Sequence, residues 1–249
     1  MMEIQPMRSS PSPNSEDFAS TRWSVVLAAG RTELPDSQQA LAELCQSYWY
    51  PLYAYVLRRT NNPHEAQDLI QEFFSHLLEH NAFAVANPER GRFRAFLLTS
   101  LRNFLTDQWN KAKAKKRGGH RMRLSLDFEF AKSRYAIEPA DEQTPERIYD
   151  RQWAITLLDL VMTRLRDELV RADKALYFEQ LKVFLGGRTG TSYAQVARKL
   201  GISPGAAMVA AHRLRRRYRD LLRAEIAQTV ASPAEVDDEI RTLFSCLNR

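Results

Sequence analysis

The chain has 249 residues, of which 44% are hydrophobic and 27% are charged, a composition that indicates a globular protein and excludes collagen-like or low-complexity chains. It contains no apolar run of membrane-spanning length, no signal-peptide pattern and only two cysteines, Cys45 and Cys246, so we expect a cytoplasmic protein without membrane insertion. The formal net charge of +6 and the pI of about 9.4 favour an anionic partner.

Every clear periodicity along the chain is helical, which predicts an all-α fold of two small helical domains joined by a linker. The serine- and proline-rich start is predicted to be disordered. The expected segments are a disordered lead at 1–17, a first domain at 18–118, a linker at 119–143, a second domain at 144–226 and a helical extension at 227–249.

Three helices are predicted in the first domain. Apolar residues recur at spacings of three and four from Leu41 to Leu57, in a helix that Pro51 is expected to kink. Asn62 followed by Pro63 is a start signal for a second helix, with the asparagine as N-cap. A third apolar stripe runs from Phe93 to Trp109 and ends in a basic segment.

The second domain is predicted to begin at Thr144-Pro145, with helices over Ile148–Leu169 and Leu176–Leu185. In the extension, Ser232 and Glu235 form a capping-box pattern for a last helix ending at Leu247. That helix is expected to carry Val236, Ile240, Leu243, Phe244 and Leu247 on one face and Asp237, Asp238, Glu239 and Arg241 largely on the other. We expect it to support the fold by packing, and the alternative is an acidic autoinhibitor, Glu235 included, over the preceding basic helix.

The stretch Ser192–Arg219 has the pattern of a helix-turn-helix whose second helix continues into a row of arginines. Ser192 and Gln195 form a capping box, Gly201 suits the turn, and Ser203 before Pro204 starts the second helix. The residues predicted to contact DNA are Ser203, Gly205, Met208, Val209, His212, Arg213, Arg216 and Arg217. An ordinary helical hairpin in an all-α core is the structural alternative.

Basic residues are segregated into two segments. Residues 111–123 contain seven Lys or Arg and no acid, and residues 213–223 contain six with one acid, Asp220. The rest of the chain has 23 basic against 29 acidic residues. Because a solvated helix face usually mixes both signs, this segregation favours a polyanionic partner such as nucleic acid.

The order of these parts resembles the bacterial sigma-70 family, specifically its small extracytoplasmic-function type. The segment PHEAQDLIQEFFSHLL is similar to region 2.2, and PERGRFRAFLLTSLRNFLTDQWNKAKAKKR is similar to regions 2.3 and 2.4. The stretch from KALYFEQLKVFL to HRLRRRYRDLL is similar to region 4. The resemblance implies a promoter-specificity subunit with core RNA polymerase and promoter DNA as partners, and it is compatible with an anti-sigma protein or another regulatory partner.

The resemblance also assigns roles to individual residues. Asp68, Gln71 and Glu72 are implied to bind polymerase, and the region 4 helix-turn-helix is implied to read the minus 35 element. Asn103 is implied to lie near a pocket for a flipped base of the minus 10 element. The implied minus 10 set is Arg102, Asn103, Asp107, Trp109, Lys111, Lys113, Lys115 and Lys116. Aromatic planes for this work are offered by Phe96, Phe104 and Trp109, which at helical spacing are more often core.

Two other functions fit parts of the sequence. A helix-turn-helix regulator that is not a sigma factor would use the same DNA-reading motif, although it would not need a basic segment in a separate domain. His76, Glu79 and His80 match the H-x-x-E-H pattern of a zinc metallopeptidase, but so short a pattern is easily matched by chance. We therefore predict a protein that is not an enzyme and needs no cofactor or metal.

Overall fold

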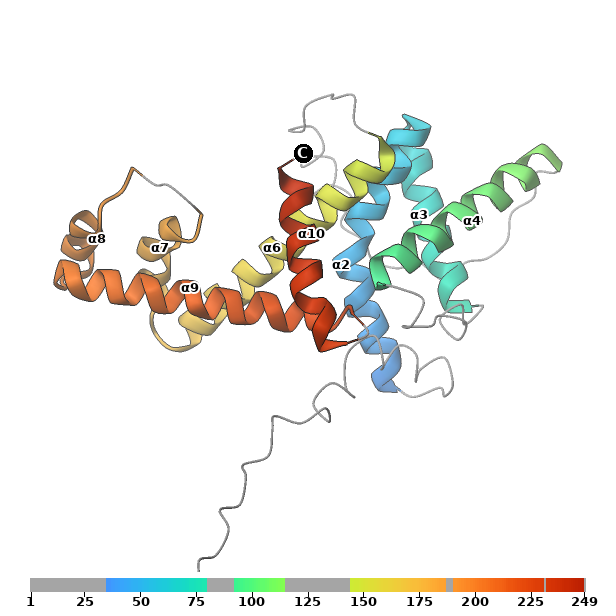
Figure 1. Ribbon diagram of the computed structural model, residues 1–249. Helices are drawn as coiled ribbons and strands as arrows, with labels where there is room; N and C mark the ends of the chain where they lie inside the picture. The colour runs from blue at the N-terminus through green and yellow to red at the C-terminus, as the bar shows by residue number, and fades with distance from the viewer. Residues whose placement is uncertain (1–34, 80–91, 115–143, 187–189, 231, 249) are drawn as a thin grey trace, which may run out of the picture.

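A computed structural model describes residues 35–79, 92–114, 144–186, 190–230 and 232–248. Over these ranges the ordered elements are helices, without a strand, which confirms the predicted all-α class (Figure 1). None of the described helices combines the length and the apolar character needed to cross a membrane. The predicted lead at 1–17 and linker at 119–143 lie outside the described residues, and the predicted domain bounds stay predictions.

The helices follow one another with short connections where both flanks are described. In chain order they are α2 (Pro35–Thr60), α3 (Pro63–Glu79), α4 (Phe93–Ala114), α6 (Pro145–Arg171), α7 (Ala175–Leu181), the 3-10 turn η4 (Lys182–Phe184), α8 (Tyr193–Leu200), α9 (Pro204–Ala227), the 3-10 turn η5 (Pro233–Glu235) and α10 (Val236–Leu247). The helix expected over Leu176–Leu185 therefore ends earlier and closes with a 3-10 turn. Its first apolar residue, Leu176, is 58% exposed and is not part of the core.

Local capping chemistry fixes most helix starts where the sequence predicts them. The Asn62 side chain accepts the backbone N–H groups of His64 and Glu65, and Thr144 caps α6. The start of the last helix differs. The Ser232 hydroxyl donates to the Glu235 carboxylate and caps no backbone group, so the chain enters α10 through the 3-10 turn η5.

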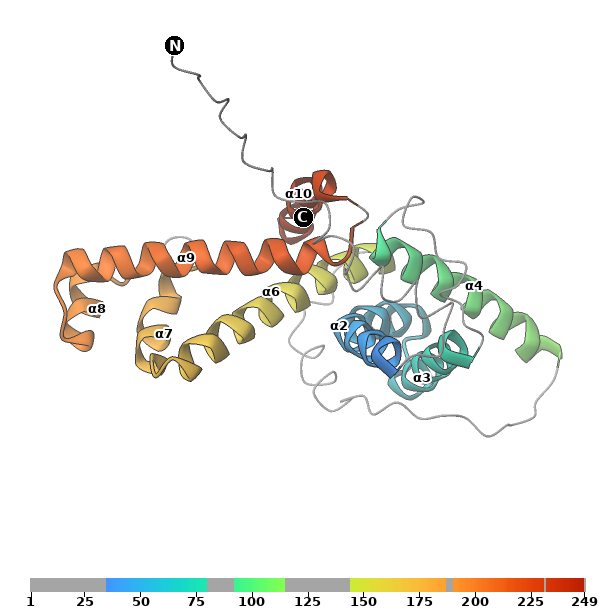
Figure 2. The same cartoon turned by 90° about the horizontal axis from the view of Figure 1, so that it is seen from below.

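A first core joins the amino-terminal helices to the carboxy-terminal part of the chain. The most buried large side chains of α2 are aromatic, including Tyr50, Tyr53 and Tyr55, and α3 adds Phe73 and Phe74. The first half of α6 inserts its own buried residues into the same cluster: Tyr149, Trp153, Ala154, Leu157 and Val161. Helices α2 and α6 therefore pack side by side, although the sequence places them in different predicted domains (Figure 2).

A second, smaller core holds the helix-turn-helix. It is built from Leu165 at the far end of α6, Phe178 and Leu181 of α7, and Val196 and Leu214 of α8 and α9. Helices α6 and α9 contribute to both cores, because Leu222 and Ile226 at the end of α9 belong to the first. These two long helices therefore form the frame that connects the two ends of the molecule (Figure 1).

The last helix, α10, packs on α6 and α9. Val236 and Leu243 are buried as predicted, but two other predicted positions are wrong: Phe244 is 47% exposed, and Glu239 is 1% exposed instead of lying on the polar face. Two arginines at the start of α4 explain this burial. Arg92 and Arg94 contact the two carboxylate oxygens of Glu239 at 2.6 Å and 2.7 Å.

Arg94 is the centre of this ion-pair cluster. It also pairs with Asp150 of α6, and its guanidinium lies 4.9 Å from the centre of the Trp153 ring. Burial lowers the pKa of Arg94, but the charges of Glu239 and Asp150 more than offset this, so its pKa lies above the usual value. The cluster fastens α10 and α6 to the first turn of α4, far from the first residues of α9 (Figure 1).

Candidate nucleic-acid interface

The helix-turn-helix forms as its sequence predicts. Ser192 and Gln195 make the complete capping box of α8, and Gly201 ends that helix in the left-handed conformation at φ 66°. The Ser203 hydroxyl oxygen then accepts the Ala206 N–H at 3.1 Å and starts α9. Small buried residues, Ala197 and Ala207 among them, let the two helices approach closely. The turn geometry and the small packing residues leave the first turns of α9 exposed.

All eight residues predicted to contact the minus 35 element are exposed on α9 or at its N-cap: Ser203, Gly205, Met208, Val209, His212, Arg213, Arg216 and Arg217. Met208 is 53% exposed and its neighbour Val209 is 46% exposed, so the first turns of α9 present two adjacent apolar side chains to solvent. Apolar contact of the kind a methionine offers is one way in which proteins recognise thymine methyl groups.

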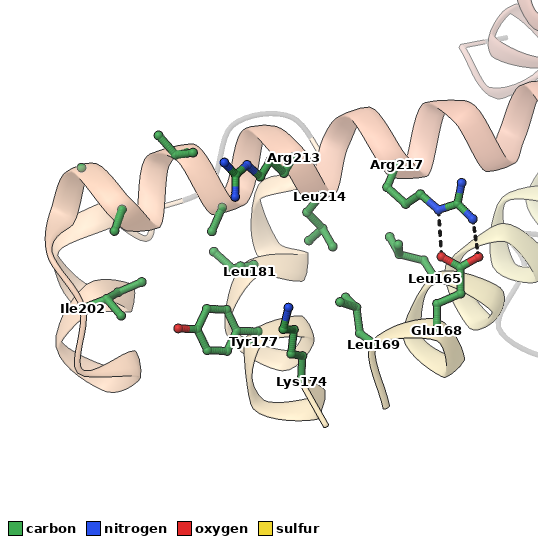
Figure 3. A pocket seen from close by; sticks show the side chains of 14 residues that line it. Leu165, Glu168, Leu169, Lys174, Tyr177, Leu181, Ile202, Arg213, Leu214 and Arg217 are labelled. Carbon is green, nitrogen blue, oxygen red and sulfur yellow. Dashed lines mark hydrogen bonds and ion pairs between the residues drawn. The ribbon is translucent and has the colours of Figure 1, made fainter. Parts of the chain in front are cut away.

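A cavity of about 610 Å³ opens between α9, α7 and the end of α6 (Figure 3). Leu169 and Tyr177 line its floor, and the Lys174 ammonium points from α7 toward α9. Val209 and Arg213 line the same cavity, so one side of the recognition helix borders this groove. Met208, His212 and Arg216 are not among the lining residues, and they occupy the side of α9 away from it.

The arginine row of α9 does not present one uniform basic face. Arg217 is held by the Glu168 carboxylate of α6, with two nitrogen–oxygen distances of 2.8 Å and 2.6 Å (Figure 3). The hydrogen bond from Arg217 holds the pKa of Glu168 below its usual value. Arg213, Arg216 and Arg219 are exposed and have no ion-pair partner among the described residues. The sequence alone shows the row and predicts a DNA contact for Arg217, which stays a prediction.

A second polar surface lies on α4. Arg102, Asn103 and Asp107 are exposed, and Leu101 and Leu105 face the core. Lys111 and Lys113 belong to the last turns of this helix, and Lys115 and Lys116 lie outside the described residues. The exposed residues of the predicted minus 10 set therefore follow one side of α4 toward its basic end.

The aromatic side chains near this surface are already packed against other residues of the chain. Phe104 is buried and Phe96 packs against the first core. Trp109 is half-buried, and the guanidinium of Arg59 from α2 lies 4.9 Å from the centre of its ring. A base could stack on Trp109 only if Arg59 moved or shared the ring. The position of Arg59 carries no signal in the sequence, because the two residues are fifty positions apart.

The predicted polymerase-binding residues lie along α3. Asp68 is exposed, whereas Gln71 and Glu72 are half-buried. The Glu72 carboxylate accepts a hydrogen bond from the Gln108 amide of α4. This hydrogen bond links α3, which carries the predicted polymerase-binding residues, to α4, which carries Asn103.

The metallopeptidase pattern gains no support. His76 is exposed and its ring centre lies 5.6 Å from that of Phe104, Glu79 is the last residue of α3, and His80 lies outside the described residues. The described part of the chain contains no group of three His, Cys, Asp or Glu side chains placed to hold a metal.

Comparison with known families identifies Sigma-70 region 2 over residues 44–115, which takes in the second half of α2 and all of α3 and α4. The chain is also 27% identical over 190 residues to an ECF RNA polymerase sigma factor, SigE, of Mycolicibacterium smegmatis. That alignment covers 76% of this chain, and it spans 64% of the length of the relative. No solved structure matches.

The all-α chain thus combines a segment that matches Sigma-70 region 2 with a helix-turn-helix that follows it. The part of the chain that matches a known family is therefore the region 2 segment, and the longer similarity is to an extracytoplasmic-function sigma factor.

Proposed function

We propose that this protein is a promoter-specificity subunit that binds core RNA polymerase in the cytoplasm and directs transcription initiation through a minus 10 and a minus 35 element. It carries no catalytic chemistry of its own. The observation that supports this most is the pairing of a region 2 domain with a correctly capped helix-turn-helix whose reading side is exposed. A regulator that only blocks transcription would not need the first of these parts.

The arrangement of the two polar surfaces supports separate contacts with DNA. The helix-turn-helix and the basic end of α4 lie at opposite ends of the molecule in both views (Figures 1 and 2). Between them runs α9, whose 24 residues span about 36 Å. Two surfaces so far apart suit two separated elements of one promoter better than one continuous site.

The two surfaces differ in the kind of contact they offer. On α9, Met208 and His212 can reach base edges in the major groove, while Arg213 and Arg216 hold phosphates. On α4, the Asn103 amide provides donors and an acceptor for an unpaired base, and the lysines after it provide charge without sequence information. We assign duplex reading to α9 and capture of the opened strand to α4.

The test is promoter-directed transcription with purified components. The full chain is added to core polymerase on a template library of genomic fragments, and transcripts are mapped. We expect new start sites only when both proteins are present, each preceded by the same two sequence elements. Asp68→Lys, on the exposed edge of α3, should reduce these transcripts and weaken capture of the chain by immobilised core polymerase.

Glu65→Lys is the matched control, because Glu65 is an exposed acid in the first turn of the same helix and is outside the predicted set. A chain that binds duplex DNA but only lowers transcription by a complete polymerase would instead be a helix-turn-helix regulator. That result would contradict the proposal.

A further inference from the structure

Arg215 lies in the middle of the arginine row, yet its side chain turns back toward the protein. It is half-buried, and its Nε donates to the backbone carbonyl of Phe184 at 2.8 Å. Its Nη2 donates to the hydroxyl of Tyr193 at 3.1 Å. The rings of Phe184 and Tyr193 stack beside it, with centroids 4.5 Å apart. One guanidinium therefore joins α9 to η4 and to the first residue of α8.

These two acceptors lie on either side of the connection that leads into α8. The described residues of that connection include Gly186 and Gly190, which restrain backbone direction poorly. Phe184 is the last residue of the 3-10 turn, which is closed by the Leu185 N–H on the Lys182 carbonyl, so the Phe184 carbonyl lies at the end of a helical segment, where a cationic donor is favourable. Arg215 therefore adds a side-chain restraint on the direction of α8 from across the connection, beside the packing of α8 on α7 and α9.

We infer that Arg215 is a positioning residue, which sets the angle between α8 and the recognition helix and does not contact the DNA backbone. The inference rests on the proposed function for its consequence, because the angle between the two helices determines how α9 enters the groove. The planar guanidinium is essential to this role, since its fork reaches both acceptors at once, whereas a lysine ammonium offers a single donor point.

Charge-preserving substitution separates the two roles. A phosphate contact needs positive charge, which lysine also supplies. A positioning residue at this place needs the planar guanidinium, which reaches both acceptors. The variants are Arg215→Lys and Tyr193→Phe, with Arg216→Lys and Arg216→Ala as matched controls, because Arg216 is the exposed neighbour. Each full-length variant is compared below its melting temperature by two measurements. The first is amide hydrogen exchange over α8, and the second is anisotropy of a fluorescein-labelled duplex of mixed sequence at several KCl concentrations.

We expect Arg215→Lys to speed exchange over α8 by about tenfold, because a lost hydrogen bond to a charged group contributes at least 1.4 kcal/mol, about a factor of ten. Its duplex affinity should fall although its charge is kept. Tyr193→Phe, which removes one of the two bonds, should give a smaller change in the same direction. Arg216→Lys should leave exchange over α8 at the wild-type rate, and Arg216→Ala should lower the salt slope by about 0.9 with unchanged exchange.

Wild-type exchange and wild-type affinity in Arg215→Lys would overturn the inference and make Arg215 a phosphate contact. The exchange measurement is made without DNA, so it tests the positioning of α8 by Arg215 independently of DNA binding. If the unaltered protein bound no duplex in the presence of core polymerase, the proposed function would fail while the positioning of α8 by Arg215 could still be established.

Discussion

The contribution of α10 to stability can be tested at two adjacent residues. Leu243 is fully buried between α10 and its neighbours, whereas Phe244 is 47% exposed. Leu243→Ala should lower the free energy of unfolding by about 3 kcal/mol, because removing a buried leucine side chain loses its burial and leaves a cavity. For a chain of this size that corresponds to a fall of about 6–12 °C in the melting temperature. Phe244→Ala should cost less than about 1 kcal/mol.

Thermal unfolding followed by circular dichroism measures both variants. Equal effects at the two positions would refute the packing of α10 described above. The same experiment on a chain lacking residues 232–249 addresses the autoinhibitor alternative. We expect the truncated chain to melt at a lower temperature and to direct the same or less transcription. An unchanged melting temperature together with stronger transcription would make α10 an inhibitor.

Three further predictions follow from the ion pairs and from α4. Glu239→Ala should destabilise the chain by about 3–5 kcal/mol in urea unfolding, because it removes the buried carboxylate that Arg92 and Arg94 share and leaves Arg94 with Asp150 as its remaining ion-pair partner, whereas Asp238→Ala should change stability by less than about 0.5 kcal/mol. Because the pKa of Glu168 is lowered in the folded chain, its pairing with Arg217 stabilises the fold at neutral pH, and this contribution is lost as the pH falls through that pKa. The small difference in stability between wild type and Arg217→Ala should therefore vanish in acid. Asn103→Ala should reduce base discrimination at one minus 10 position by about 1–3 kcal/mol in transcription from base-substituted templates, and an equal loss on every template would contradict its role.

Local chemistry explains what the sequence predicts well. The capping boxes, the left-handed Gly201 and the alternation of small and exposed residues in the helix-turn-helix depend on contacts within a few residues of each other. The same holds for Asn62 and Thr144 at their helix starts. Contacts between residues that are close in the sequence can be predicted from the sequence, and the exposed side of α9 was predicted correctly from them.

Long-range contacts account for what the sequence did not predict. Glu239 reads as one more acid on a polar helix face, and only the approach of Arg92 and Arg94, some 145 positions away, makes its burial favourable. The first half of α6 shares a core with α2, which no periodicity indicates. Arg217 likewise reads as part of a basic row until Glu168 is found opposite it. Each case depends on which helices become neighbours.

The central claim is that one chain contacts two separate promoter elements with two different surfaces, and footprinting of the polymerase complex tests it most directly. Hydroxyl-radical and permanganate footprints would be recorded on one promoter with core polymerase and the full chain. We predict an upstream protected segment that is lost when Met208 and Arg216 are both replaced by alanine, and permanganate-reactive thymines downstream that depend on Asn103. A single continuous footprint without reactive thymines, or one that forms equally well without core polymerase, would contradict this account.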